Sequence, residues 1–450
     1  MQSLLSYWKK FTTGSTNRQI FGAAVTVAVM TILVKAAIVG KELVVAWRFG
    51  TADELDAFLI AYIIPSFIIN VVAGSFNAAL IPTYIRVREQ EGLAAAQRLF
   101  SGVMIWSLGL LGITTLLMVA AAPLYLPWIA RGFNAEKLSL TLHLLYLIAP
   151  VVLLSGIVVI WGAVLNAGER FALVALSPIL TPTLSVLFLL AAPSWGIFAL
   201  AVGLVCGSLL EMMVLGITLR RQGIVLRPRW YGFEQHLRQV AGQYAPMIAG
   251  AFLMSSTTLV DQMMAAMLSP GSVAALNYGN RVIAFPISLA ATALGTAVIP
   301  YFSKMVAHKD WKKIRHTLQR YLLFVFIISV PLAGYIFLFS NSIVRIIFQR
   351  GSFTENDTYL VAQIQSFFAL QIPFYIGGIL VVRLIASLRS NQVLMWGAAI
   401  NFIVNIFLNY LFIEKLGVAG VALSTSCVMM VSFGFVFGYC LSFLRKNINE

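Results

Sequence analysis

Residues 138–165 read LSLTLHLLYLIAPVVLLSGIVVIWGAVL, and residues 418–443 read VAGVALSTSCVMMVSFGFVFGYCLSF. Neither stretch contains Asp, Glu, Lys or Arg. A helix of roughly 20 apolar residues crosses the hydrocarbon core of a bilayer, so each stretch is long enough to span one. Lipid offers backbone N–H and C=O groups no partner, and barrel strands would show short alternating segments instead. Both stretches therefore predict transmembrane α-helices.

The rest of the chain has the same character. Of its 450 residues, 60% are hydrophobic and 10% are charged, with a mean hydropathy of +0.90. A soluble protein carries about 25% charged and about 45–50% apolar residues. We therefore predict an all-α integral membrane protein. The formal net charge of +15 lies mostly in the connections between apolar runs, which argues for attraction to the membrane surface and against nucleic-acid binding.

Apolar runs between charged or Pro- and Gly-containing breaks predict twelve spans in two six-helix lobes. They lie near residues 20–47, 56–85, 99–127, 138–166, 171–192, 196–219, 240–267, 273–303, 320–342, 358–386, 392–413 and 417–443.

Basic residues alternate between the connections on the two sides of these spans. One side carries Lys9, Lys10 and Arg18, the cluster at Arg220, Arg221, Arg227, Arg229 and Arg238, and the C-terminal Arg445 and Lys446. The other side carries fewer, among them Arg131, Lys137, Arg345, Arg350 and Lys415. The positive-inside bias predicts that both termini lie in the cytoplasm. The first residues, with Trp8, are expected to be an amphipathic lead rather than a cleavable signal.

The two halves of the chain resemble each other at a shift of about 220 residues. Arg131-Gly132-Phe133 recurs as Arg350-Gly351-Ser352-Phe353, and Gly196-Ile197 recurs as Gly417-Val418. Pro150 is echoed by Pro373. Six spans per half make this a parallel repeat, with an N-terminal lobe at 1–228 and a C-terminal lobe at 229–450. Two such bundles suit alternating access, so we expect a transporter rather than a channel.

Ionisable residues within spans are candidates for function, because each costs about 2.5–3.5 kcal/mol to insert at mid-membrane. Those considered in the predicted spans are Lys35, Lys41, Glu42, Asp56, Glu211, Asp261, Arg281 and Arg383, of which Glu211 is as well explained by a position near the headgroups. Lys35, Lys41 and Arg281 are predicted to bind an anionic cargo, although neutralisation by Glu42 and Asp261 is the alternative. Glu42, Asp56 and Asp261 are predicted to serve in a gate or in ion coupling. Asp56 is as well explained as a helix cap, and Arg383 as a side chain that snorkels to the surface.

Three amides accompany these charges. Asn70, Asn277 and Asn280 are predicted to hydrogen-bond sugars, with the alternative that they join helices. A site with surplus Lys and Arg suits a diphosphate.

No G-x-x-x-x-G-K-[ST] loop and no metal-like spacing of Cys and His occurs, so we expect neither an enzyme nor a bound cofactor or metal. Export of two negative charges gains about 4–5 kcal/mol per 100 mV, so the membrane potential or Na⁺/H⁺ coupling is expected to drive transport.

Three motifs carry a family resemblance. They are Asp56-Ala57-Phe58 with Ile81-Pro82, Leu165-Asn166-Ala167-Gly168-Glu169-Arg170-Phe171, and Leu276-Asn277-Tyr278-Gly279-Asn280-Arg281 with Phe285-Pro286. Together they resemble the MurJ/MviN lipid II flippase family of the MOP exporter superfamily, over essentially the whole chain. The resemblance implies two six-helix lobes in a V, a central cationic cavity and export of undecaprenyl-diphosphate-linked sugars. It also implies a multi-pass protein of the bacterial cytoplasmic (inner) membrane. Glycan polymerases or glycosyltransferases are the partners it suggests besides the bilayer.

Carried over by position, the first-span arginines of the family fall on Lys35 and Lys41. The acidic residue that opens the second span falls on Asp56, and the eighth-span arginine on Arg281. The family's arginine pair midway along span two falls on Ile69 and Asn70, and two further C-terminal helices of the family have no counterpart among the twelve predicted spans. These departures favour an exopolysaccharide or O-antigen repeat unit slightly over lipid II.

Two other functions remain open on the sequence. A cation-coupled multidrug antiporter of the same superfamily would have an acidic cavity, opposite to the Lys and Arg surplus. A scaffold without transport activity would tolerate alanine at Lys35, Lys41 or Arg281.

Overall fold

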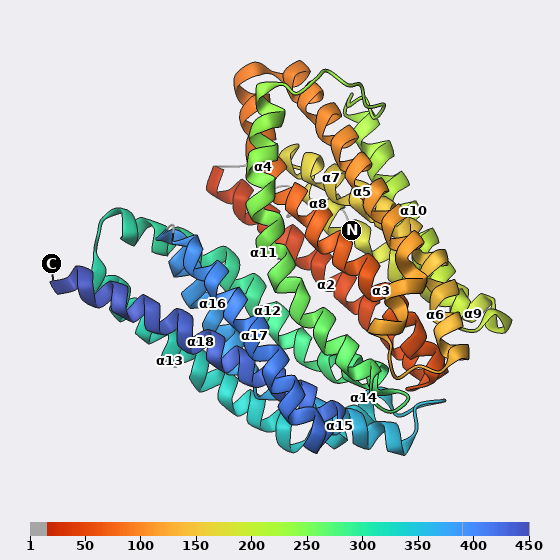
Figure 1. Ribbon diagram of the computed structural model, residues 1–450. Coiled ribbons are helices and arrows are strands. Elements are labelled where there is room, and N and C mark those ends of the chain that lie inside the picture. Colours follow the sequence, from red (N-terminus) through yellow and green to blue (C-terminus); the bar gives the residue numbers. More distant parts are fainter. Residues whose placement is uncertain (1–15, 389, 450) are drawn as a thin grey trace, which may run out of the picture. The chain divides into compact units, whose positions relative to one another are not determined.

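The structure, a computed structural model, describes residues 16–388 and 390–449, which are helical almost throughout (Figure 1). The predicted lead with Trp8, Lys9 and Lys10 lies outside the described residues. The helices are α2 (Thr16–Phe49), α3 (Asp53–Ile68), π-helix η1 (Ile69–Ala73), α4 (Gly74–Glu91), α5 (Leu93–Ile129), α6 (Ala135–Ile148), α7 (Pro150–Ala167), α8 (Phe171–Leu176), 3₁₀-helix η2 (Ser177–Ile179), α9 (Leu180–Ala191), 3₁₀-helix η3 (Pro193–Trp195), α10 (Ile197–Arg221), α11 (Gln235–Ala266), α12 (Ser272–Ala307), α13 (Trp311–Leu338), α14 (Ser340–Phe348), α15 (Glu355–Ala369), α16 (Ile372–Ser387), α17 (Asn391–Leu416) and α18 (Val418–Asn449).

The predicted helical membrane fold is confirmed. Within the described residues, nine helical segments are long and apolar enough to cross a membrane, and each coincides with a predicted span. The other three predicted spans, near 20–47, 240–267 and 273–303, coincide with α2, α11 and α12, which are 34, 32 and 36 residues long. These three helices carry most of the ionisable residues that the sequence places within the membrane.

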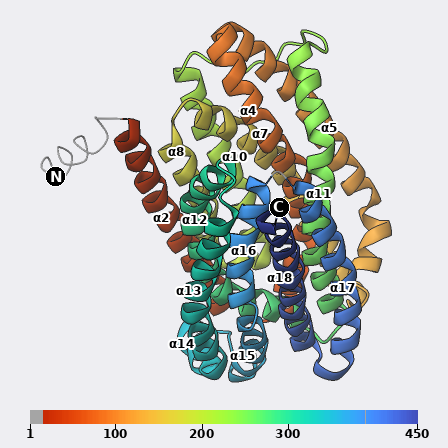
Figure 2. The same cartoon turned by 90° about the vertical axis from the view of Figure 1, so that its left-hand side faces the viewer.

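The described chain divides into two compact units that do not follow the sequence halves. Unit 1 comprises residues up to Val45, Ala61–Leu126 and Leu138–Ala251, and unit 2 comprises Ala46–Ile60, Pro127–Lys137 and the chain from Phe252 onward. In unit 2, α16 packs against α12, α13 and α18 (Figure 2). Two short segments of the N-terminal half thus belong to a body built from the C-terminal half. The lobe boundary at 228/229 stays a prediction.

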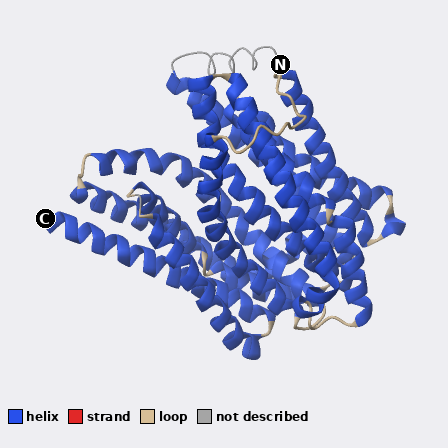
Figure 3. Cartoon of the chain, turned by 45° about the horizontal axis from the view of Figure 1, so that its top comes forward, coloured by secondary structure: helices blue, strands red, loops and turns tan. Residues whose placement is uncertain are grey.

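Several spans consist of two helices with a break between them. Figure 3 shows how short the loops between the helices are. Pro150 opens α7 directly after α6, and Pro373 lies in the first turn of α16 after α15. Proline has no N–H to donate and its ring clashes with the preceding turn, so it ends one helix and starts the next. Between α3 and α4 the break is the π-helical turn η1. Here the hydroxyl of Tyr244 donates to the carbonyl of Val72, with an O–O distance of 3.1 Å.

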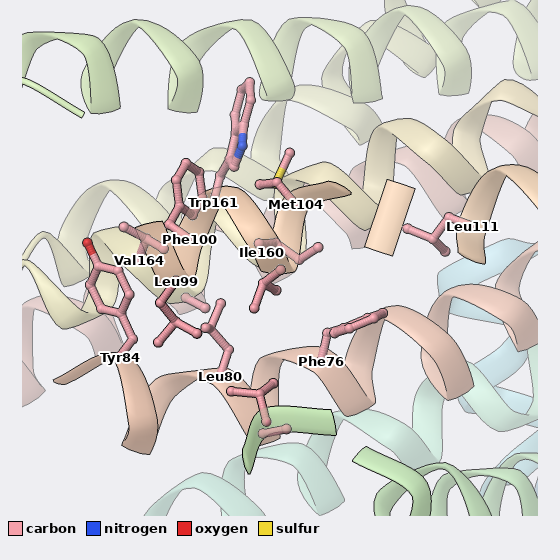
Figure 4. Close-up of a cluster of buried hydrophobic side chains, with 14 of the residues drawn as sticks. Phe76, Leu80, Tyr84, Leu99, Phe100, Met104, Leu111, Ile160, Trp161 and Val164 are labelled. Atoms are coloured by element: carbon pink, nitrogen blue, oxygen red, sulfur yellow. The ribbon is translucent and has the colours of Figure 1, made fainter. Parts of the chain in front are cut away.

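A hydrophobic core of unit 1 lies where α4, α5 and α7 meet (Figure 4). Phe76 and Leu80 of α4 face Phe100 and Met104 of α5, and all four are at most 2% exposed. Tyr244 of α11 stacks on Phe76 with ring centroids 4.1 Å apart. Tyr244 therefore attaches α11 to α4 by ring packing and to the π-helical turn by a hydrogen bond.

Small residues allow α9 and α10 to touch along their backbones. A Cβ atom on Gly203 would lie 2.5 Å from Cα of Ser185, and one on Gly207 would lie 2.5 Å from Cα of Thr181. Glu211, one turn beyond Gly207, is 8% exposed and accepts a hydrogen bond of 2.8 Å from the hydroxyl of Ser177. The helix contact therefore buries a carboxyl group inside the span, with a hydroxyl as donor.

Positions that are equivalent in the sequence repeat also have similar backbone conformations. Gly196 and Gly417 each precede the last helix of their half, with φ/ψ of 54°/−131° and 56°/−138°. A residue with a side chain would be strained in this conformation, so glycine is required at both places. Pro150 and Pro373 break matching spans in the same way. These equivalences support the predicted duplication.

We expect Gly207→Ala to destabilise the protein by about 1–3 kcal/mol, because the added methyl group would push α10 away from the backbone of α9. The measurement is the thermal unfolding midpoint of the purified protein in detergent. Gly109→Ala on α5 is the matched control, since a Cβ there meets no heavy atom within 4 Å. Equal midpoints for the two variants would show that α9 and α10 do not depend on this close contact.

Candidate functional site

Asp56 lies at the centre of a buried ion cluster in unit 2. It is 1% exposed, and its carboxylate is 2.9 Å from Nζ of Lys137. The backbone N–H groups of Gly271 and Ala274 donate to the same carboxylate, both at 2.8 Å. Lys137 also reaches Asp53 at 2.5 Å. A buried charge is tolerated only when it is paired and hydrogen-bonded, and Asp56 meets both conditions.

The cluster explains how α12 begins. The first N–H groups of a helix have no partner within the helix, and a carboxylate there also benefits from the helix dipole. Asp56 fills this role from a distant part of the chain. Gly271 has φ of +84°, and a Cβ on it would lie 2.5 Å from the carbonyl oxygen of Thr51. Asp56 thus caps α12 rather than its own helix, and its roles in a gate or in ion coupling stay predictions.

Two further contacts hold the same segments in unit 2. The N–H of Ser352 donates to the carbonyl of Trp47 at 2.8 Å, and the hydroxyl of Thr51 is hydrogen-bonded to Asp357. Asp357 also closes a capping box with Thr354 at the start of α15. The turn that follows α2 is thus fastened to the start of α12 and to the start of α15.

Asp261 of α11 forms a second polar cluster in unit 2. Its carboxylate accepts hydrogen bonds from the amides of Asn405 at 2.9 Å and Asn409 at 2.7 Å, both on α17. The hydroxyl of Thr425 on α18 donates at 3.2 Å. These three donors are neutral. The cluster supplies carboxylate, amide and hydroxyl oxygens, which are the ligands preferred by hard cations.

The partners of both aspartates were not predicted from the sequence. Lys137 was assigned only to a connection. In the structure its ammonium group is buried, and its backbone N–H donates to the side-chain oxygen of Asn134 at the start of α6. Asn401, Asn405 and Asn409 recur every fourth residue in an apolar helix, so they share one face. That spacing was a usable signal for a polar stripe directed at another helix.

The predicted basic residues of the first span lie in unit 1. Nζ of Lys41 is 3.1 Å from the carboxylate of Glu42, and both side chains are less than a quarter exposed. Lys35 is half-buried on the same helix. Asn70 lies on the π-helical turn η1 and is exposed. Glu42 therefore pairs with Lys41 within the same helix.

The other predicted cargo residues lie in unit 2. Asn280 and Arg281 are exposed neighbours on α12, and Arg383 is half-buried on α16. The amide of Asn277 donates to Gln262 of α11 at 3.1 Å and to the carbonyl of Val273 at 2.9 Å. Asn277 thus joins two helices, as the structural alternative predicted, while Asn280 and Arg281 present polar groups at the surface of the unit.

The sequence matches the family profile of the lipid II flippase MurJ over residues 45–447. It is 25% identical over 439 residues to a probable lipid II flippase MurJ of Synechocystis, covering 93% of this chain and 81% of that protein. It is also 25% identical over 425 residues to the lipid II flippase MurJ of Burkholderia cenocepacia, covering 90% and 80%.

Solved structures show the same fold. A lipid II flippase MurJ in an inward closed conformation superposes with a TM-score of 0.80 at 21% identity, covering 92% of this chain and 87% of that one. An inward-facing multidrug resistance MATE transporter of the MOP superfamily gives a TM-score of 0.75 at 14% identity, covering 95% and 99%. From its sequence and its fold, this chain belongs to the MurJ lipid II flippase family, and it is a multi-pass membrane transporter of lipid-linked cell-wall precursor rather than an enzyme.

Proposed function

We propose that this chain flips an undecaprenyl-diphosphate-linked cell-wall precursor of the lipid II class from the cytoplasmic to the outer leaflet, with both termini in the cytoplasm. The observation that carries the proposal is the family match over residues 45–447, together with Lys35, Lys41 and Arg281 inside helices that coincide with predicted spans. An exopolysaccharide or O-antigen repeat unit is the second candidate cargo. It is favoured by Ile69 and Asn70, which stand where the family has two arginines.

The three basic residues suit the diphosphate of such a cargo. Arg281 offers a planar guanidinium that can hold two phosphate oxygens at once, and it is exposed on α12. Lys35 and Lys41 act as point charges with three donors each. We propose that Lys35, Lys41 and Arg281 share the attraction for the diphosphate, with Lys41 also 3.1 Å from the carboxylate of Glu42. Glycan polymerases and glycosyltransferases are the enzymes that would deliver or consume the cargo.

The Asp56 cluster is proposed to hold one state of the transport cycle closed. It joins Asp56 and Lys137 of the N-terminal half to the first turn of α12 in the C-terminal half. A contact that must break and form again in each cycle needs directional bonds rather than a large apolar surface. One buried ion pair with two helix-capping bonds has this character.

The Asp261 cluster is proposed to couple transport to Na⁺ or H⁺. The hydrogen bonds that link its carboxylate to α17 and α18 come from two amides and a hydroxyl, which are neutral. A monovalent cation or a proton would therefore balance the charge of the carboxylate. Binding there would change how α11 is held against α17 and α18. The membrane potential would supply the rest of the driving force for an anionic cargo.

Arg281→Ala is expected to abolish flipping, because the guanidinium that contacts the diphosphate is lost. The measurement is growth of cells depleted of their own lipid II flippase, with membrane levels of each variant checked. Arg281→Lys should restore part of the growth, and Arg345→Ala, an exposed residue of α14, should grow like wild type. Normal growth with Arg281→Ala would contradict the assigned role. Failure of the inserted wild-type protein would favour the exopolysaccharide unit as cargo.

Asp56→Asn is expected to loosen the start of α12 by about 1.5–3 kcal/mol, because its N–H groups lose a charged acceptor and Lys137 keeps only Asp53 as a carboxylate partner. The measurement is the labelling rate of Ala274→Cys by a membrane-impermeant maleimide, in a background with Cys206, Cys427 and Cys440 replaced. Labelling should accelerate at least about tenfold, since a loss of this size exceeds the 1.4 kcal/mol that corresponds to a factor of ten. Glu355→Cys, at an exposed position, should react equally in both backgrounds. Unchanged labelling of Ala274→Cys would argue against a gate.

Asp261→Asn is expected to remove ion coupling while keeping the shape of the side chain. Purified wild-type protein should bind Na⁺, or take up a proton, with about 1:1 stoichiometry by isothermal titration calorimetry, and the variant should not. Asn401→Ala is the matched control, because Asn401 lies on the same face of α17 but bonds Ser432 instead. If Asp261→Asn binds the ion like wild type, the coupling site lies elsewhere.

A further inference from the structure

The connection from α10 to α11, residues 222–234, is held firmly against unit 1 (Figure 1, the green loop that leads into α11). The side chain of Gln97 on α5 makes two hydrogen bonds to the backbone of Val225, donating at 2.8 Å and accepting at 3.1 Å. The N–H of Arg229 donates to the hydroxyl of Ser101 at 3.3 Å. Ile224 is 7% exposed and belongs to the core of the unit. The start and middle of the connection therefore have a fixed inner face.

The end of the connection is fastened as well. Leu237, in the first turn of α11, is 2% exposed and packs on Gly102 of α5. Nε2 of His236 is 2.8 Å from the carboxylate of Glu91. With both ends and the middle attached, the outward side chains of the connection keep a defined arrangement.

Those outward side chains form what we name the Arg-aromatic loop: Arg227, Arg229, Trp230, Tyr231 and Phe233. The three aromatic residues are 46–51% exposed, and the rings of Trp230 and Phe233 meet edge to face at 5.2 Å. Both arginines are exposed. Large aromatic side chains gain from leaving water, and Trp and Tyr gather at the membrane–water interface because one part is apolar and another is polar.

The charge around the loop is mainly positive. Arg98 of α5 lines a small hollow with Tyr231, and Arg220 and Arg221 are exposed at the end of α10. Glu234 lines the same hollow, and the nearby Glu91 is paired with His236. Five arginines thus lie near two acidic side chains, Glu234 and Glu91. Guanidinium groups bind phosphate oxygens with paired hydrogen bonds, so an anionic phosphodiester fits the loop.

The position of the loop along the helices points to the bilayer surface. Its hydrogen bonds reach Gln97 and Ser101, in the first turns of α5, just before the long apolar part of that helix. The apolar part of α10 ends at Arg220 and Arg221 at the same place. Aromatic rings held there would lie at the depth of the headgroups and the first methylene groups.

We propose that the Arg-aromatic loop is a binding site for anionic phospholipid headgroups, with the arginines on the phosphate and the rings of Trp230, Tyr231 and Phe233 among the upper acyl segments. The site lies outside the candidate cargo residues. It would anchor the connection between the two halves to the membrane surface. A soluble protein partner is the competing occupant, and the test separates the two.

The test measures tryptophan quenching in nanodiscs of phosphatidylcholine that contain either brominated phosphatidylglycerol or brominated phosphatidylcholine at equal mole fraction. The signal of Trp230 is the difference between wild type and Trp230→Phe. We expect brominated phosphatidylglycerol to quench this signal at least about twofold more strongly. Added salt should reduce the preference, because exposed charges are screened.

Two sets of variants make the result specific. Arg227→Gln combined with Arg229→Gln should equalise quenching by the two lipids while the thermal midpoint stays unchanged, since both side chains are exposed. Trp195 is the matched control, being 51% exposed in the turn before α10, and its signal should show no preference. Equal quenching of Trp230 by both lipids would overturn the proposal. Absence of quenching by either lipid would also overturn it and leave a soluble partner as the occupant.

Discussion

A lipid bilayer offers no hydrogen-bond partner to a peptide group, and most of this structure follows from that constraint. Every polar backbone group within a span must be bonded inside the protein, so the described chain is helical almost throughout. At two breaks between helices, a side chain bonds a backbone group that has lost its helical partner. Tyr244 donates to the carbonyl of Val72 at the π-helical turn, and Asp56 accepts the N–H groups that open α12.

The same constraint governs the charged side chains. Asp56 is satisfied by Lys137 and two N–H groups, Asp261 by two amides and a hydroxyl, and Glu211 accepts a bond from Ser177. Each of these contacts joins different helices. Hydrogen bonds to buried carboxylates therefore have two effects, since satisfying the carboxylate also fixes which helices lie together. A transporter can use such contacts as switches, because their strength depends on ions and on protons.

The class of cargo and the way in which the cargo is bound rest on different observations. The family match sets the class of cargo, and Lys35, Lys41 and Arg281 offer the charge that a diphosphate needs. The expected departure from the family at Ile69 and Asn70 bears on which cargo of this class we propose. Asn70 is exposed on a π-helical turn, a backbone form that is frequent at functional sites. Its amide suits sugar hydroxyls better than phosphate.

The helical spans, their breaks at Pro150 and Pro373 and the repeated Gly196 and Gly417 were determined by the sequence itself, because apolar length and backbone conformation are local properties. The partners of the buried charges were decided only by the tertiary structure. Asp56 meets a lysine 81 residues away and a helix start 215 residues away, and Asp261 meets an amide 144 residues away. A hydrogen bond depends on distance in space, and no pattern within one span shows which helix will face it.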